Sequence, residues 1–264
     1  MSKSSKAWKK SQRWCVSIAA ALLIASPLQA QGPVAEQVSA GDREYAARRA
    51  EAALVHYEAA LDAAPGDYGV LWRTSRTLID LAEFDENAQR RKSAFTRAGE
   101  LARQAIAVNP TDAEAHFHLA RALGREALSV PARDRTRYAL DVRTTALKVL
   151  EIEPTHAGAM HVLGRWHAEV MRLNGFTRMI AKTFMGGKVF GEASWGEAIR
   201  LLQGANAEEP NRTVHQLALA QIYRDAGEGA KARSMFEAAI AAPLWDVNDE
   251  KYKAEARREL RALK

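Results

Sequence analysis

The sequence has very little cysteine: Cys15 is the only one among 264 residues. A disulfide needs two cysteines, so a disulfide framework within the protein is excluded and the fold must be stabilised by packing. Cys15 also precedes the first apolar run instead of following it, which is not the position of a lipid-attachment cysteine. Thiol chemistry is therefore not expected of this protein.

Patterns that would indicate catalysis, a metal or a cofactor are also missing. His116 and His118 stand two apart and would point in different directions on a helix, and His161 and His167 have no carboxylate at metal-binding spacing. The Gly-Gly-Lys of residues 186–188 lacks the upstream glycine and the preceding strand of a phosphate-binding loop. We predict no catalytic residue, no metal site and no cofactor. An enzyme or metal-binding protein built on repeats is the alternative, which a cluster of His116, His161 and a carboxylate would favour.

No apolar run in the sequence is long enough to cross a bilayer. Residues 16–25 are mostly apolar, about ten residues where a membrane-spanning helix needs roughly 20. They follow a cluster of basic residues and precede Leu28-Gln29-Ala30, which ends in a small residue. This order is typical of a secretory signal peptide, here residues 1–30. We therefore expect an exported protein, periplasmic or secreted, without stable membrane insertion after cleavage. Retention of the leader as an anchor is the alternative.

The net positive charge of the protein is concentrated in this leader. Lys and Arg outnumber Asp and Glu by 38 to 32, which gives a net charge of +6. Removal of residues 1–30 leaves 33 against 32, a net charge of +1, because it takes away Lys3, Lys6, Lys9, Lys10 and Arg13. A nearly neutral protein gives no reason to expect nucleic acid or an anionic membrane as a partner.

The sequence does contain a repeat of amphipathic helices. Pro65, Pro110, Pro154 and Pro210 each end an Ala-rich segment, at spacings of 45, 44 and 56 residues. Proline is tolerated at the start of a helix and disfavoured inside one, so each marks a boundary between helices. Small residues recur 5, 8 and 12 positions before each proline, which lets two helices approach closely. These positions hold Ala60, Tyr57 and Ala53; Ala105, Ala102 and Ala98; Val149, Ala146 and Val142; and Ala205, Leu202 and Ala198.

The last unit matches the tetratricopeptide consensus, whose period is about 34 residues. The matching residues are Leu219, Ala220, Tyr223, Gly227, Ala232, Phe236, Ala239 and Pro243. We predict an all-α, tetratricopeptide-like, right-handed α-solenoid of four to five helical hairpins over residues 41–264. Residues 31–40 would be a linker and the start of the first helix, and residues 249–263 a C-terminal capping helix. Because the spacings exceed the consensus, we expect about ten added residues between paired helices, at 84–97 and 125–138.

The 56-residue spacing between Pro154 and Pro210 indicates an insertion at residues 171–192. An extra inserted helix packed on the solenoid is the favoured interpretation, because apolar stripes at helical spacing usually belong to a core. A mobile, Met-rich flap hinged at Gly175 and residues 186–187 is the second interpretation, and contact with a membrane surface is the third. The stripe consists of Met171, Leu173, Phe176, Met179, Ile180 and Phe184.

The lengthened repeats, the sequence LGRWHAEV at residues 163–170, the apolar insertion after it and the closing final unit together resemble the regulator of microtubule dynamics family. The resemblance covers most of residues 34–263. It implies a tetratricopeptide-like fold and a non-enzymatic adaptor role. The microtubule and organelle-contact roles of the family's animal members form an alternative, which requires that the leader stay uncleaved.

In the consensus register, the first helix of each unit lines the concave face. The arginines there form a row, and guanidinium groups grip carboxylates, so we predict a protein- or peptide-binding scaffold whose ligand carries acidic segments or a free C-terminus. The alternative is that these arginines pair with carboxylates on their own helices, namely Asp80, Glu114, Glu169 and Asp225. The predicted groove residues are Trp72, Arg73, Arg76, Phe117, His118, Arg121, Arg125, Arg165, Gln221 and Arg224.

Overall fold

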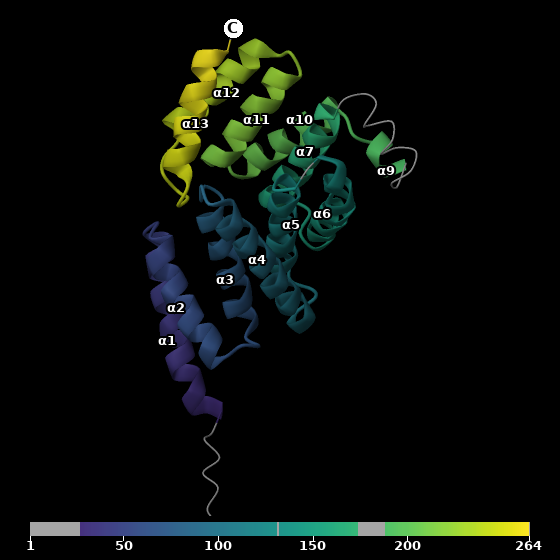
Figure 1. The fold of residues 1–264 in the computed structure, drawn as a ribbon. Helices are drawn as coiled ribbons and strands as arrows, with labels where there is room; N and C mark the ends of the chain where they lie inside the picture. The colour runs from purple at the N-terminus through teal and green to yellow at the C-terminus, as the bar shows by residue number, and fades with distance from the viewer. Residues whose placement is uncertain (1–26, 131, 174–187, 264) are drawn as a thin grey trace, which may run out of the picture.

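The computed structural model describes residues 27–130, 132–173 and 188–263, and this part of the protein is built from α-helices (Figure 1). None of the described helices is both long and apolar enough to cross a membrane. The helices are α1 (Pro27–Ala46), α2 (Ala50–Ala63), α3 (Tyr68–Ala82), α4 (Ala88–Val108), α5 (Ala113–Leu128), α6 (Ala132–Ile152), α7 (Ala157–Arg172), α9 (Lys188–Gly191), α10 (Trp195–Glu208), α11 (Thr213–Asp225), α12 (Gly229–Ala241) and α13 (Asp249–Ala262).

The helices pack as consecutive antiparallel hairpins, which confirms the predicted solenoid. In the described ranges, α1 pairs with α2, α3 with α4, α5 with α6, α7 with α10, and α11 with α12. The fourth pair is formed across the insertion, as the long spacing predicted. The helix α13 packs on α11 and α12 as the predicted cap. The inner helices α3, α5, α7 and α11 contact one another in turn and form the concave side.

Three of the four boundary prolines, Pro65, Pro110 and Pro154, are followed two positions later by the N-cap residue of the next helix. Asp67 accepts a hydrogen bond from Val70 N at 2.9 Å, and Asp112 accepts one from Glu114 N at 2.9 Å. His156 takes the same role through its ring, since Ala159 N donates to Nδ1 at 3.1 Å. Each of these caps satisfies a backbone N–H that has no partner within its helix. A proline with a capping residue two positions later therefore fixes where α3, α5 and α7 begin.

The sequence analysis predicted about ten added residues in the connections between paired helices, at 84–97 and 125–138. Most of these residues do not lie in the connections. They lengthen the second helix of the pair: α4 and α6 have 21 residues each, whereas α2 and α10 have 14. Asn87 explains the early start of α4, because its side-chain oxygen accepts from Gln89 N and Arg90 N at 3.0 and 2.9 Å. Similarly, α1 already includes residues 31–40, where the sequence suggested a linker leading into the first helix.

The small residues predicted from the proline spacing form the contacts between helices. All twelve positions 5, 8 and 12 residues before the four prolines are buried. At Gly164 in α7, an added Cβ would lie 2.8 Å from Leu202 Cγ and 3.1 Å from Ala198 O, both in α10. The close approach of this pair therefore requires glycine at position 164. Short side chains at these sites allow the ridges of one helix to enter the grooves of the next.

Part of the insertion is packed into the core. Of its residues, 174–187 lie outside the described part of the protein, together with the possible hinges Gly175 and 186–187. The short helix α9 follows, and its Phe190 is 1% exposed. The Phe190 ring stacks on Trp166, with ring centroids 6.0 Å apart, within a cluster that includes Leu123 and Val142. This contact supports the interpretation of a packed element at the end of the insertion.

The C-terminal unit closes the solenoid on itself. Asn248, just before α13, donates through Nδ2 to the carbonyl oxygen of Asp80 in α3 at 2.8 Å. Tyr252 packs edge-on against Phe84, with centroids 5.3 Å apart, and Arg48 donates to Leu244 O at 3.3 Å. In Figure 1 the yellow C-terminal helix reaches the end of α3. The inner helices and the C-terminal unit therefore surround a space that is partly open to solvent.

The packing of Phe190 can be tested by truncation. We expect Phe190→Ala to lower the free energy of unfolding by about 3 kcal/mol, because it removes a fully buried ring. Urea denaturation of the full-length protein measures this change. Val55→Ala is the matched control, since Val55 is 68% exposed and its loss should cost less than about 0.5 kcal/mol. Equal values for the two variants would favour the flap interpretation instead.

Candidate functional site

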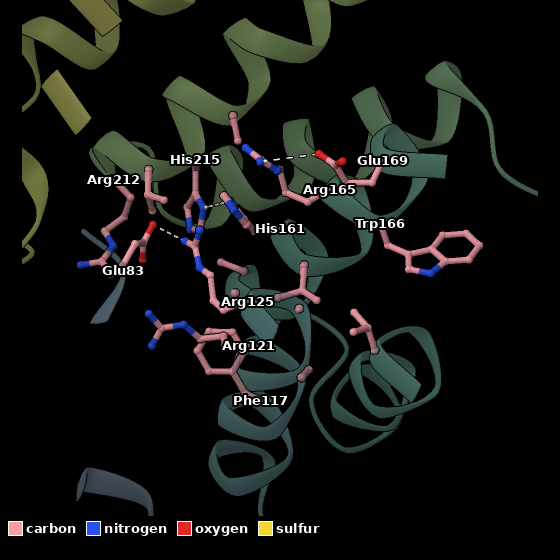
Figure 2. A pocket seen from close by; sticks show the side chains of 18 of the residues that line it. Glu83, Phe117, Arg121, Arg125, His161, Arg165, Trp166, Glu169, Arg212 and His215 are labelled. Carbon is pink, nitrogen blue, oxygen red and sulfur yellow. Dashed lines mark hydrogen bonds and ion pairs between the residues drawn. The ribbon is translucent and has the colours of Figure 1, made fainter. Parts of the chain in front are cut away.

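The space enclosed by the solenoid is a central cavity of about 1010 Å³. Its walls come from the inner helices α3, α5, α7 and α11, with contributions from α1, α6, α9 and the segment before α13. The cavity lies on the face that the repeat register predicted to be concave. It is therefore the candidate functional site (Figure 2).

The structure brings seven of the ten predicted groove residues together around this cavity. They are Arg76, Phe117, His118, Arg121, Arg125, Arg165 and Gln221. The other three do not line it. Trp72 stacks on His118 with centroids 5.7 Å apart, and Arg73 pairs with Asp42 at 2.9 Å. Arg224 pairs with Glu259 and with Asp225.

The row of arginines is largely neutralised by carboxylates of the protein itself. Arg121 contacts Asp80 at 2.6 Å, and Arg125 pairs with Glu83. Both pairs join α5 to the α3 region, so these two arginines are paired with carboxylates of the neighbouring unit. The alternative considered from the sequence was pairing with carboxylates on the same helix. Arg121 therefore acts in packing the repeats, and it is not a free anion-binding group.

Arg165 has only a distant carboxylate to compensate its charge. Its Nη1 donates to Gln221 Oε1 at 2.8 Å, while the nearest Glu169 oxygen lies 3.8 Å away. Burial lowers the pKa of Arg165, which means that its positive charge is poorly solvated. A ligand carboxylate in the cavity would offset the free-energy cost of this charge. The guanidinium N–H groups can donate hydrogen bonds to such a carboxylate.

Arg76 is held in a different way, by aromatic rings. Its guanidinium lies 3.6 Å from the centroid of Tyr45 and 5.1 Å from that of Trp72. It also donates to the Tyr57 hydroxyl at 3.3 Å. Within the described residues no carboxylate lies in ion-pair distance of Arg76. These contacts fix the side chain at one end of the cavity through cation–π attraction.

Two histidines from different repeats meet in the cavity wall, a contact that the sequence did not predict. His161 Nδ1 and His215 Nδ1 are 2.9 Å apart, and His215 Nε2 lies 3.0 Å from Glu209 Oε2. Burial is the main cause that lowers the pKa of both histidines, in the case of His161 well below its ordinary value. Figure 2 shows the two rings facing each other, with Arg165 on one side and Arg125 on the other.

One lobe of the cavity is apolar. It lies between α5, α6, α7 and α9, over the core cluster that buries Trp166 and Phe190. Leu128 and Leu173 also line this lobe, and Leu128 is 39% exposed. Burying an apolar side chain here would remove its surface from water, which contributes about 25 cal/mol per Å². The cavity thus offers charged groups on one side and an apolar surface on another.

At the opposite rim, the segment before α13 brings Asp246 close to the buried Asp80. Asp246 Oδ2 lies 3.3 Å from Arg212, and Oδ1 accepts from Asn248 N at 3.1 Å. Burial, and then the negative charge of Asp80, raise the pKa of Asp246 from 3.8 to about 6. The contact that closes the solenoid therefore contains a carboxylate whose ionised form is disfavoured.

The structure gives no support to the metal-binding alternative in the described residues. The grouping that would have favoured it is not formed, because His116 bonds to the Pro110 carbonyl while His161 contacts His215. Residues 27–130, 132–173 and 188–263 contain no group of three or more His, Cys, Asp or Glu suited to a metal ion.

Comparison with known proteins supports the fold and the family. The family profile described as regulator of microtubule dynamics protein 1-3 matches residues 35–264. The protein is 27% identical to regulator of microtubule dynamics protein 3 of Xenopus laevis over 183 residues, and 23% identical to that of Mus musculus over 181 residues. These matches span 68% of this chain but 38% of each relative, so the protein spans well under half of their length.

A solved structure has the same fold. The thermophilic TPR protein of Thermus thermophilus superposes with a TM-score of 0.63 at 20% identity, over 85% of this chain and 99% of that one. This similarity shows a tetratricopeptide-like solenoid. Because the family profile matches nearly all of the described residues, the protein belongs to the regulator of microtubule dynamics family.

The raised pKa of Asp246 predicts a pH dependence of stability. Folding disfavours the ionised form, so the free energy of unfolding should fall by up to about 3 kcal/mol as the pH rises from about 4 to about 7. Asp246→Asn cannot ionise. We expect this variant to be more stable than wild type at about pH 7.5 and equal to it at about pH 4, by thermal and urea unfolding. The exposed Asp141→Asn is the control, and a gain at both pH values would contradict the assignment to Asp246.

Proposed function

We propose that this member of the regulator of microtubule dynamics family is a non-catalytic scaffold that binds a short segment of another protein in its central cavity. The observation that carries the proposal is the cavity of about 1010 Å³ among the inner helices, with the segment before α13 at its rim. This volume lies near the upper end of the roughly 300–1,000 Å³ of ligand sites in proteins. It suits a short extended segment and is too small for a folded domain.

The two sides of the cavity suggest what such a segment carries. The apolar lobe lined by Leu128 and Leu173 fits one hydrophobic anchor side chain. Arg165, whose ion-pair partner Glu169 lies 3.8 Å away, fits a carboxylate, either an acidic side chain or a free C-terminus. Arg121 and Arg125 are already paired with Asp80 and Glu83. We therefore propose one contact between a ligand carboxylate and Arg165, in place of contacts with a row of arginines.

Microtubule regulation, which the relatives' names state, is not part of this proposal. The matched region is 38% of those proteins, and the property in their name can belong to the rest of their sequences. An exported location remains part of the proposal, supported by the basic cluster and apolar run of residues 1–30.

Export predicts cleavage of the leader. We expect the natively expressed protein to begin at Gln31, and the mass of the intact protein measures this directly. Attachment of a green fluorescent protein, which does not mature after export through the general secretory route, gives an independent readout of the compartment. A native protein that keeps residues 1–30 and is recovered from the cytoplasm would contradict export and would restore the alternative of an uncleaved leader.

The binding proposal is tested with peptides and one cavity variant. Random peptides with free C-termini are selected on the wild-type protein, and their affinities are measured by fluorescence anisotropy. We expect Arg165→Gln to weaken the selected peptides by about tenfold or more, because it removes a charged hydrogen-bonding partner. Arg224→Gln is the matched control, since Arg224 lies outside the cavity and should leave the affinity unchanged.

Thermal unfolding of both variants shows whether either substitution disturbs the fold. Failure to select any peptide would contradict the proposed function. Selected peptides that bind wild type and Arg165→Gln equally would place the binding surface elsewhere on the molecule.

A further inference from the structure

We propose that His161 takes up a proton when a carboxylate binds in the central cavity, so that ligand capture is coupled to pH. This inference rests on the proposed function and adds a regulation of the same site. It is carried by the hydrogen-bonded series Glu209–His215–His161 and by the position of this series beside Arg165. The repeats supply its members from α7, from α11 and from the connection before α11.

The hydrogen bonds determine which nitrogens carry protons. The Glu209 carboxylate can only accept, so His215 Nε2, at 3.0 Å, is the donor. In a neutral His215 the other nitrogen, Nδ1, is then an acceptor. His161 Nδ1, 2.9 Å from it, must donate. A neutral His161 is left with its proton on Nδ1 and a bare lone pair on Nε2.

The bare nitrogen of His161 is open to the cavity. His161 is among the lining residues, and its Nδ1 side is turned toward His215. Among the described residues Nε2 has no hydrogen-bond partner, and the His161 residue is partly exposed. A proton taken up by His161 therefore goes to an atom that a ligand can contact.

The charges around the histidine pair explain why His161 is neutral without a ligand. Burial opposes its charged form, and the nearby cations add to this effect. Around His215, the acceptor Glu209 acts in the opposite direction but does not outweigh burial. The groups that act on the pair are Arg165 on α7, Arg121 and Arg125 on α5, and Arg212, His156 and Glu209 in the connections before α11 and α7.

A ligand carboxylate changes this balance. Placed between Arg165 and His161 Nε2, its negative charge favours the imidazolium form, whose new N–H can donate to it. The neutral form would instead place a nitrogen lone pair against the carboxylate oxygen. Binding of the carboxylate and binding of a proton from solvent therefore assist each other, as linkage requires. The hydrogen bond to His215 Nδ1 is kept in both states.

The sign of the pH dependence follows. The carboxylate of a peptide C-terminus stays ionised above about pH 4.5, so its own titration adds nothing between about pH 8 and pH 5.5. Within this window the affinity should rise as the pH falls, by at most about tenfold per pH unit for one proton. Asp246 titrates in the same range at the opposite rim, and comparison with a His161 variant separates the two groups.

The experiment uses N-acetyl-leucine, which carries an apolar side chain and a carboxylate, with N-acetyl-leucinamide as the neutral probe. Ring signals of isotope-labelled histidines in the full-length protein are followed by NMR at about pH 8 and pH 5.5. We expect N-acetyl-leucine to bind about tenfold or more tightly at the lower pH and to shift the titration of His161 upward. N-acetyl-leucinamide should show neither effect.

His161→Gln keeps a neutral polar side chain and cannot take up the proton. We expect its affinities for N-acetyl-leucine at about pH 8 and pH 5.5 to differ little, so that most of the gain seen in wild type is lost. His116→Gln is the matched control, because His116 bonds to the Pro110 carbonyl outside the cavity. A loss of the gain in both variants would contradict a specific role of His161.

The outcomes separate this inference from the proposed function. An affinity that is the same at both pH values overturns proton uptake and leaves peptide binding intact. Peptides that bind while N-acetyl-leucine does not bind at any pH overturn the carboxylate subsite. If neither the peptides nor the probe bind, the proposed function itself fails.

Discussion

The arrangement of the first three units of this solenoid depends on one buried carboxylate. Asp80 in α3 is 2% exposed and accepts hydrogen bonds from Tyr45 in α1 and from Arg121 in α5, each at 2.6 Å. Its backbone carbonyl accepts a third from Asn248 of the last unit. Burial alone would raise the pKa of Asp80, but Arg121 and Tyr45 hold it below its ordinary value. A buried charge left without its partner costs about 3–5 kcal/mol, so these units are held in one arrangement.

The cavity is a consequence of that arrangement. Small residues set how closely neighbouring helices stack, and the contact between Asn248 and Asp80 brings the last unit back to the second. The arginines then divide into two kinds. Arg121 and Arg125 join repeats through Asp80 and Glu83, whereas Arg165 faces the cavity with a distant carboxylate. The arginines that join the repeats are thus different from the arginine that can bind a ligand carboxylate.

The features that depend on residues near one another in the sequence could be predicted from the sequence alone. The prolines and small residues predicted the helix boundaries, the buried positions and the capping helix α13. The sequence was not sufficient for contacts across the ring: His161 and His215 are 54 positions apart, and Asn248 and Asp80 are 168 apart. Such contacts depend on how far each unit rotates on the one before, which small packing differences set. The lengthened α4 did leave a local signal, the cap Asn87.

The central claim is that a ligand binds inside the ring formed by α3, α5, α7 and α11. A crystal structure of the protein with a selected peptide tests it most directly. We expect the peptide to lie in the central cavity, with a carboxylate in hydrogen-bond distance of Arg165 and an apolar side chain against Leu128 and Leu173. A peptide seated on the outer helices, with the cavity free of it, would contradict the account.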